Sequence, residues 1–311
     1  MKRNITIGMI AASLLFSGIQ GYGMEAYAAS GTEEIQSMTL AEDQGVPVNG
    51  ILVLGHERRL FTPALGEGPY WVLDDTGRLL GAYDFAANAE TKSGRPVYAE
   101  MNVVDAGRAD DGFAKAYDSV YRVKSIRKIQ SMGSMPIRAV LFWDTASFKI
   151  VAERNMLTIE PEGLAAVNRK ETQDILGYSV TGMEVGDLNQ DGWPEVFVYL
   201  TSHGSGSYGK LAGYSVNNGK SMSQVYLPTV EVEKESRARE GYRGHDRMKI
   251  DGEYLTVTFP VYRETDSNAL PTGGERILRY RLKDGEAGRQ FELVDIQNVP
   301  KQEGKSTEKN T

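Results

Sequence analysis

One segment carries oxygen-bearing side chains at alternate positions, with a glycine at the sixth, a spacing typical of the start of a calcium-binding loop. Its residues are Asp187, Asn189, Asp191, Gly192 and Glu195. An EF-hand loop also needs a bidentate glutamate at position 12, where this chain has Val198. Glu195, at position nine, offers another way to close a cation loop on a β-hairpin. A metal-free turn at Asp191-Gly192 explains the same residues, and we adopt it, with calcium as the alternative.

A second segment is rich in glycine and serine: His203-Gly204-Ser205-Gly206-Ser207-Tyr208-Gly209. A serine near a histidine suggests a hydrolase, whose nucleophile lies in a Gly-x-Ser-x-Gly turn from strand to helix. Around Ser207 the first glycine is replaced by Ser205, and residues 211–216 predict a strand instead of a helix. A flexible linker does not normally separate two strong strands so closely. We therefore predict a protruding hairpin loop that presents Ser205, Ser207 and Tyr208 for binding, in a protein that is not an enzyme.

Three further stretches combine glycine, proline and polar residues: 241–246, 259–262 and 266–274. The last of them contains Pro271-Thr272-Gly273-Gly274. None has the spacing of a catalytic site, and by residue type alone each indicates turns.

The elements that must position these residues are strands, because short runs of β-branched and aromatic residues recur between turn residues. The sequence therefore predicts an all-β protein. In the second half, at least eight strands favour an antiparallel sandwich or flattened barrel. The expected strands are 51–54, 70–73, 97–104, 121–129, 148–153, 157–159, 179–185, 195–201, 211–216, 224–227, 254–262, 276–282 and 291–296, with a turn at 74–77 and a helical turn at 113–117.

Composition excludes several classes of protein. The chain has no cysteine, so it has no disulfide, thiolate metal site, cysteine nucleophile or lipid-modified cysteine. Three histidines are too few and too scattered to suggest a histidine-built metal centre. A net charge of −7 argues against a general nucleic-acid binder and favours association with basic partners.

The first 28 residues predict a secretory signal peptide. Lys2 and Arg3 precede an apolar stretch, 5–16, that is too short to span a bilayer comfortably. Ala26-Tyr27-Ala28 supplies small residues for cleavage after Ala28. We expect a periplasmic or secreted mature protein without membrane attachment; a retained anchor is the alternative. Loss of Lys2, Arg3 and Glu25 changes the net charge from −7 to −8.

The remaining chain divides by composition. Residues 29–48 are polar and predict a flexible leader, and 301–311 predict a disordered tail. The stretch 130–136 contains glycine, serine, methionine and proline, which indicates a domain boundary. We expect a small β-rich domain over 49–135 and a second β domain over 140–300.

The motifs of the second half follow one another in order. They are Asp187-Leu188-Asn189-x-Asp191-Gly192-x-Pro194-Glu195, Gly204-Ser205-Gly206-Ser207-Tyr208-Gly209, Leu227-Pro228, Gly244-His245-Asp246, Phe259-Pro260, Asn268-Ala269 and Pro271-Thr272-Gly273-Gly274. In this order they resemble the bacterial periplasmic inhibitors of invertebrate-type (I-type) lysozyme. The resemblance runs from about 146 to 299.

This resemblance implies an all-β domain, without cofactor or metal, whose loop enters the active-site cleft of a lysozyme. By motif match, Ser205-Gly206-Ser207-Tyr208 is the inserted loop, and Pro271–Gly274 is a second contact. The Ser-Gly-x-Tyr element is shared with inhibitors of chicken-type lysozyme, so I-type lysozyme is the first expected partner and other classes stay open. The alternative function is a cell-surface adhesion or carbohydrate-binding module stabilised by calcium at Asp187–Glu195.

The first half resembles a small β-barrel module of exported bacterial lipoproteins, similar to an OB fold. The resemblance rests on Gly55-His56-Glu57 and Gly94-Arg95-Pro96-Val97-Tyr98. It implies no ligand for this half.

Overall fold

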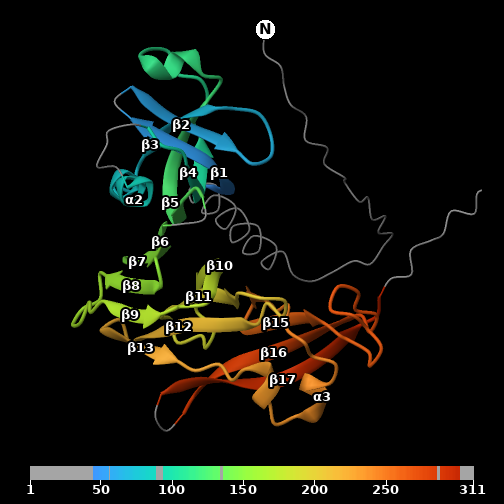
Figure 1. The fold of residues 1–311 in the computed structure, drawn as a ribbon. Helices are drawn as coiled ribbons and strands as arrows, with labels where there is room; N and C mark the ends of the chain where they lie inside the picture. Colours follow the sequence, from blue (N-terminus) through green and yellow to red (C-terminus); the bar gives the residue numbers. More distant parts are fainter. Residues whose placement is uncertain (1–44, 56, 89–93, 134–135, 286–287, 302–311) are drawn as a thin grey trace, which may run out of the picture. The chain divides into compact units, whose positions relative to one another are not determined.

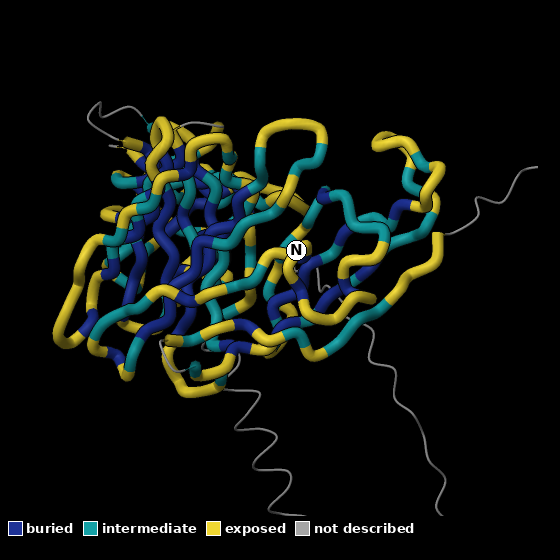
Figure 2. The backbone as a smooth tube through the Cα atoms, turned by 60° about the horizontal axis from the view of Figure 1, so that its bottom comes forward, coloured by how far each residue is buried: buried dark blue, intermediate teal, exposed yellow. Residues whose placement is uncertain are grey.

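The computed structural model describes residues 45–55, 57–88, 94–133, 136–285 and 288–301 (Figure 1). The predicted signal peptide, most of the predicted leader and nearly all of the predicted tail lie outside the described residues. Residues 46–48, expected in the leader, belong to the first strand. The described chain is all-β, as the sequence predicts. Figure 2 shows that the buried stretches of the described chain gather together, whereas many of the projecting loops are exposed.

The first five strands close into a small barrel. Neighbouring strands follow the order β3-β2-β1-β4-β5, and a parallel pairing of β3 with β5 joins the two ends. Their bounds are Val46–Gly55 (β1), Arg58–Pro63 (β2), Tyr70–Asp74 (β3), Val97–Asp105 (β4) and Val120–Ser131 (β5). Side chains alternate between the two faces of a strand, so every second residue of β4 is buried in the barrel core. This arrangement agrees with the OB-like barrel that we expected.

A helix, α2 (Leu79–Ala87), follows the turn that we predicted at 74–77 and lies between β3 and β4 in the chain. The sequence patterns did not predict it. The Asp74 carboxylate accepts hydrogen bonds from the backbone N–H of Thr76 (2.9 Å) and of Leu79 (3.0 Å), which fixes the approach to the first helical turn. Leu79, Ala82 and Tyr83 are buried in the barrel core. The short helix is therefore stabilised by packing, since nine residues are marginal alone.

Four further strands extend the barrel sheet. They are Ile137–Trp143 (β6), Ala146–Glu153 (β7), Met156–Glu162 (β8) and Glu171–Asp174 (β9), and β6 pairs with β5. The strands before and after the predicted boundary thus belong to one sheet. Alternate residues of β6 enter different cores: Val140 and Phe142 join the barrel core, whereas Leu141 joins the next one. That the two halves are separable domains stays a prediction. One strand, β6, contributes side chains to the cores of both.

The last eight strands form two four-stranded antiparallel sheets, in agreement with the expected sandwich. One sheet contains β10 (Tyr178–Gly186), β11 (Glu195–Ser202), β12 (Gly209–Asn217) and β13 (Ser221–Val225), and the other contains β14 (Arg247–Asp251), β15 (Tyr254–Pro260), β16 (Glu275–Asp284) and β17 (Arg289–Val299). Strand β11 is buried on both faces, as its apolar sequence predicts. Val196, Val198 and Leu200 pack with β6 to β8, whereas Phe197 and Tyr199 pack with β15 and β16.

Three short helical segments complete the described chain. They are η1 (Phe113–Ala116), η2 (Val230–Val232) and α3 (Ser236–Arg239). The first confirms the expected helical turn. The other two lie in the segment 230–240, which is rich in charged residues. Val230 and Ala238 are buried and anchor this segment to the sandwich core.

Candidate functional site

The Ser205–Tyr208 segment lies in the hairpin loop between β11 and β12, as the sequence predicts. Its base is closed by two hydrogen bonds: the Ser202 N–H donates to the Tyr208 carbonyl (2.8 Å), and the Tyr208 N–H donates to the Ser202 hydroxyl (2.8 Å). Ser207 has a left-handed backbone conformation with φ of 46°. Ser205 is exposed, whereas Gly206 and Ser207 are half-buried. The loop therefore has a fixed base and an open tip.

The Tyr208 ring packs across the loop and is 41 % exposed. A Cβ atom at Gly206 would lie 2.3 Å from the Cε2 atom of this ring, so the packing requires a glycine. The ring also approaches Tyr242 edge-on, with 5.9 Å between ring centroids. Tyr242 in turn meets Phe259 of β15 at 4.7 Å. The exposed ring is thus held on an aromatic row that reaches the core.

The segment from Tyr242 to Asp246 packs against the loop and forms hydrogen bonds with it. The His245 N–H donates to the carbonyl oxygens of Gly206 (2.8 Å) and Ser207 (3.1 Å). The Gly209 N–H donates to Oδ2 of Asp246 (2.6 Å). The same carboxylate oxygen accepts the hydroxyl of Tyr242 at 2.7 Å. These contacts fix the loop to one segment, which lies between α3 and β14.

Burial is the main cause of the shifted pKa values of Asp246 and Tyr242 in this segment. It raises the pKa of the Asp246 carboxyl, against the stabilising hydrogen bonds from Tyr242 and Gly209. Burial, and then the negative charge of Asp246, raise the pKa of the Tyr242 hydroxyl. Oδ1 of Asp246 is buried and has no hydrogen-bond partner among the described residues. The pair therefore keeps the phenolic proton on Tyr242 and directs it at the carboxylate.

The second predicted contact, Pro271–Gly274, lies in the loop between β15 and β16. Asp266 organises it: its carboxylate accepts the N–H of Thr272 (2.7 Å), the hydroxyl of Thr272 (2.8 Å) and the N–H of Arg263 (2.8 Å). These bonds, with the Arg263 N–H first, lower the pKa of Asp266. Gly273 and Gly274 each pair with the backbone of Val261 at 2.9 Å. Thr272 is exposed and Pro271 half-buried.

The two loops are connected through the Tyr242–Asp246 segment. The Arg243 guanidinium lies over the ring of Tyr262, 5.0 Å from its centroid, and donates to the carbonyl of Asp266 at 2.8 Å. The His245 ring lies 6.3 Å from the Tyr262 ring. The structure thus places both predicted contact loops beside one shared segment. By residue type this segment indicates only turns, and its Gly244-His245-Asp246 is one of the motifs of the resemblance; neither predicts its role as a support.

The proposed calcium ligands occupy the turn before β11, and their oxygens bind groups of the protein. The Asp187 carboxylate accepts the N–H of Gly192 (2.8 Å), and Asp191 accepts the N–H of Trp193 (2.8 Å). The amide of Asn189 donates to Oδ2 of Asp191 (3.0 Å). The Arg289 guanidinium forms a 2.8 Å ion pair with that same Oδ2. The Arg289 guanidinium therefore already supplies a positive charge beside the Asp191 carboxylate.

Glu195, the ninth residue of this turn, is fully buried at the start of β11. Its carboxylate accepts the N–H of Leu188 (2.9 Å) and the hydroxyl of Ser215 (2.6 Å). Burial raises its pKa to about 7, more than the hydrogen bonds from Ser215 and Leu188 lower it. Within the described residues no group of three or more His, Asp and Glu side chains is arranged to hold a metal ion.

The geometry that a serine hydrolase needs is not formed at the loop of residues 203–209. The residues after the loop form strand β12, so the strand-to-helix turn of a nucleophile elbow is not formed. Nε2 of His203 lies 3.0 Å from the Ser179 hydroxyl on β10. The Ser207 hydroxyl donates to the Gly204 carbonyl at 3.4 Å. Neither contact pairs the histidine with a loop serine.

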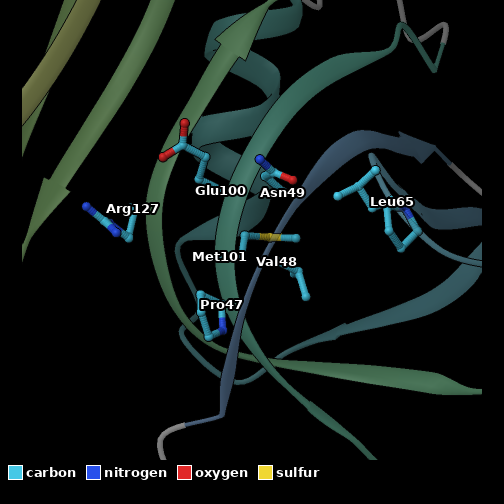
Figure 3. A pocket seen from close by; sticks show the side chains of 8 residues that line it. Pro47, Val48, Asn49, Leu65, Glu100, Met101 and Arg127 are labelled. Atoms are coloured by element: carbon cyan, nitrogen blue, oxygen red, sulfur yellow. The ribbon is translucent and has the colours of Figure 1, made fainter. Parts of the chain in front are cut away.

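The barrel carries a separate hollow of about 380 Å³ (Figure 3). Val48 and Met101 lie at its centre, with Glu100, Asn49 and Arg127 around them (Figure 3). Its lining residues include no aromatic ring, and we assign no ligand to it or to the rest of the first half.

Among the described helices, none has the length and hydropathy to cross a bilayer. Comparison with protein-family profiles, with curated proteins and with solved structures finds no match.

Proposed function

We propose that this protein is an exported lysozyme inhibitor that inserts the Ser205-Gly206-Ser207-Tyr208 loop into the active-site cleft of the enzyme. The observation that carries the proposal is the loop itself: its base and flanks are hydrogen-bonded, while the Ser205 side chain and the Tyr208 ring stay accessible. A loop that is already ordered loses little conformational entropy on binding, which favours affinity.

The chemistry of a lysozyme cleft suits these two side chains. Two carboxyl groups flank the scissile glycosidic bond, and one of them is protonated. A serine hydroxyl donates and accepts hydrogen bonds, so Ser205 can pair with either protonation state. The Tyr208 ring offers an apolar face where a sugar ring would lie, and its hydroxyl offers a polar end. The loop contains no glycoside, so the enzyme is blocked and the inhibitor is not consumed.

Two further features support the proposal. The Pro271–Gly274 loop shares the Tyr242–Asp246 segment with the inserting loop, so both can contact one partner. The net charge of −8 expected after signal cleavage would speed association with basic lysozymes at low salt. I-type lysozyme is the first expected target, by the resemblance of the motifs.

Inhibition assays with I-type, chicken-type and goose-type lysozymes test this function. Ser205→Ala and Tyr208→Ala should each raise the inhibition constant about 5-fold to 1000-fold, the effect of about 1–4 kcal/mol at the centre of an interface. Inhibition should be competitive with cell-wall substrate. Ser125→Ala and Phe113→Ala remove an exposed serine and an exposed aromatic ring of the first half, and should leave inhibition unchanged.

Two results would refute parts of the proposal. If the double variant of Ser205 and Tyr208 inhibits as strongly as wild type, the loop does not enter the cleft. If wild type inhibits no class of lysozyme, the function is wrong.

A further inference from the structure

A cavity of about 750 Å³ is lined by β4, β5 and β10 together with the turn between β7 and β8. Its volume lies within the range of small-molecule binding sites, about 300–1,000 Å³. Neither the loop at Ser205 nor the turn at Asp187 lines it. His203, which precedes the loop at Ser205, does line it, but the cavity shares no residue with the predicted lysozyme contacts or the calcium candidates.

The cavity lining is cationic. Nζ of Lys128 on β5 lies 3.7 Å from Oε1 of Glu100 and 3.4 Å from the carbonyl oxygen of Met183. Both distances exceed the 2.7–2.9 Å of a strong charge-assisted hydrogen bond, so the ammonium can donate to a ligand. Arg154 is exposed, and its guanidinium has no ion pair or hydrogen bond among the described residues. Two cations thus face one carboxylate.

The remaining lining groups are suited to sugars. Tyr98 on β4 and Tyr178 on β10 contribute aromatic rings. An ammonium lies over one face of each, that of Lys128 at 5.8 Å and that of Lys210 at 5.2 Å, so a sugar ring would pack against the rest of each ring. Gln130 and Asn155 contribute amide groups, which pair with hydroxyls and acetamido groups through both a donor and an acceptor. A single small anion would contact the two cations and leave most of this lining unused.

We propose that this cavity binds an anionic oligosaccharide. Lys128 and Arg154 pair with its carboxylates, Gln130 and Asn155 with its polar substituents, and Tyr98 and Tyr178 with its ring faces. This proposal is independent of lysozyme inhibition, because it concerns other residues and is measured by direct binding.

Calorimetric titration of the purified protein with two matched tetrasaccharides tests it. One is the neutral tetramer of N-acetylglucosamine; the other alternates N-acetylglucosamine with N-acetylmuramic acid and so adds carboxylates to the same sugar backbone. The acidic tetramer should bind saturably and at least 10-fold more tightly than the neutral one. Inorganic phosphate is the third probe and should not displace it.

Two variants locate the site. Arg154→Asn removes the exposed cation at a position with φ of 56°, which asparagine tolerates, so folding should be preserved. It should weaken binding of the acidic tetramer about 10-fold, the effect of one lost charge-assisted hydrogen bond. Lys128→Met should do the same. Arg281→Gln is the control for the loss of one positive charge, because Arg281 lies over the ring of Tyr254, outside the cavity.

Each other outcome contradicts the proposal. Equal binding of both tetramers would mean that charge is not recognised, and displacement by phosphate would mean a simple anion site. Absence of saturable binding, or an unchanged affinity in Arg154→Asn, would mean that this cavity is not a glycan site.

Discussion

The Tyr208 ring can lie across its loop only because Gly206 has no side chain. A Cβ atom there would lie 2.3 Å from the ring, so Gly206→Ala must move the ring, while the backbone at this glycine suits any residue. We expect inhibition to weaken at least about 10-fold, with the free energy of unfolding changed by less than about 1 kcal/mol. Inhibition assays and urea unfolding measure the two effects. Gly81→Ala is the control, because its added Cβ meets nothing within 4 Å. Unchanged inhibition by Gly206→Ala would show that the ring position is unimportant.

At the same scale, Glu195 predicts a pH dependence of stability. Its pKa rises from 4.5 to about 7 because the carboxyl is buried. Between these values the folded state binds more protons than the unfolded state, so stability falls as pH rises through this window, by up to about 1.4 kcal/mol per pH unit. Glu195→Gln should flatten the slope between pH 4.5 and 7 in urea unfolding. Glu162→Gln, at an exposed carboxylate of β8, should leave it unchanged. Equal slopes in wild type and Glu195→Gln would contradict the assigned pKa.

At the scale of elements, the turn before β11 is held by its own hydrogen bonds and by Arg289. Because Asp187 and Asp191 already accept backbone N–H groups, and Asp191 also pairs with Arg289, calcium would have to displace these partners. We expect 1 mM calcium to change Tm by less than about 1 °C relative to EDTA, measured by scanning calorimetry. Asp187→Ala should lower Tm equally with and without calcium. A calcium-dependent rise of several degrees would instead support the calcium-stabilised adhesion or carbohydrate-binding module.

At the scale of the whole molecule, β6 decides where the chain can be divided. Ile137 and Ala139 are buried in the core that β6 shares with β10 to β12. A fragment that starts at residue 140 loses both side chains, whereas one that starts at 136 keeps them. We expect 136–301 to fold and to keep lysozyme inhibition, and 140–301 to be less stable by about 2–5 kcal/mol, the range for large core deletions. Circular dichroism melting and inhibition assays compare them. Equal stability would show that these residues are dispensable, and an unfolded 136–301 would refute separable domains.

Much of the fold follows from local sequence patterns. The loop at Ser205–Tyr208 was predictable because two strong strands flank a glycine-rich segment, and β11 was predictable as a buried strand because its apolar run is continuous. Helix α2 and strands β2, β6, β9 and β14 were not predicted. Helix α2 is short, and its helical periodicity is too weak to predict a helix without the packing that stabilises it. Strand β6 places alternate side chains in two cores, so its sequence lacks the polar face that marks a half-buried strand.

By itself, the sequence determined the all-β class, the turns and the loop that presents Ser205 and Tyr208, because alternation and turn chemistry act over a few residues. Only the tertiary structure decided what supports that loop. Asp246 reaches Gly209 across 37 positions of sequence, and β3 closes the barrel by pairing with β5. Such contacts depend on the order in which strands pair and sheets stack. That order is set by the burial of whole faces against one another, which local patterns do not encode.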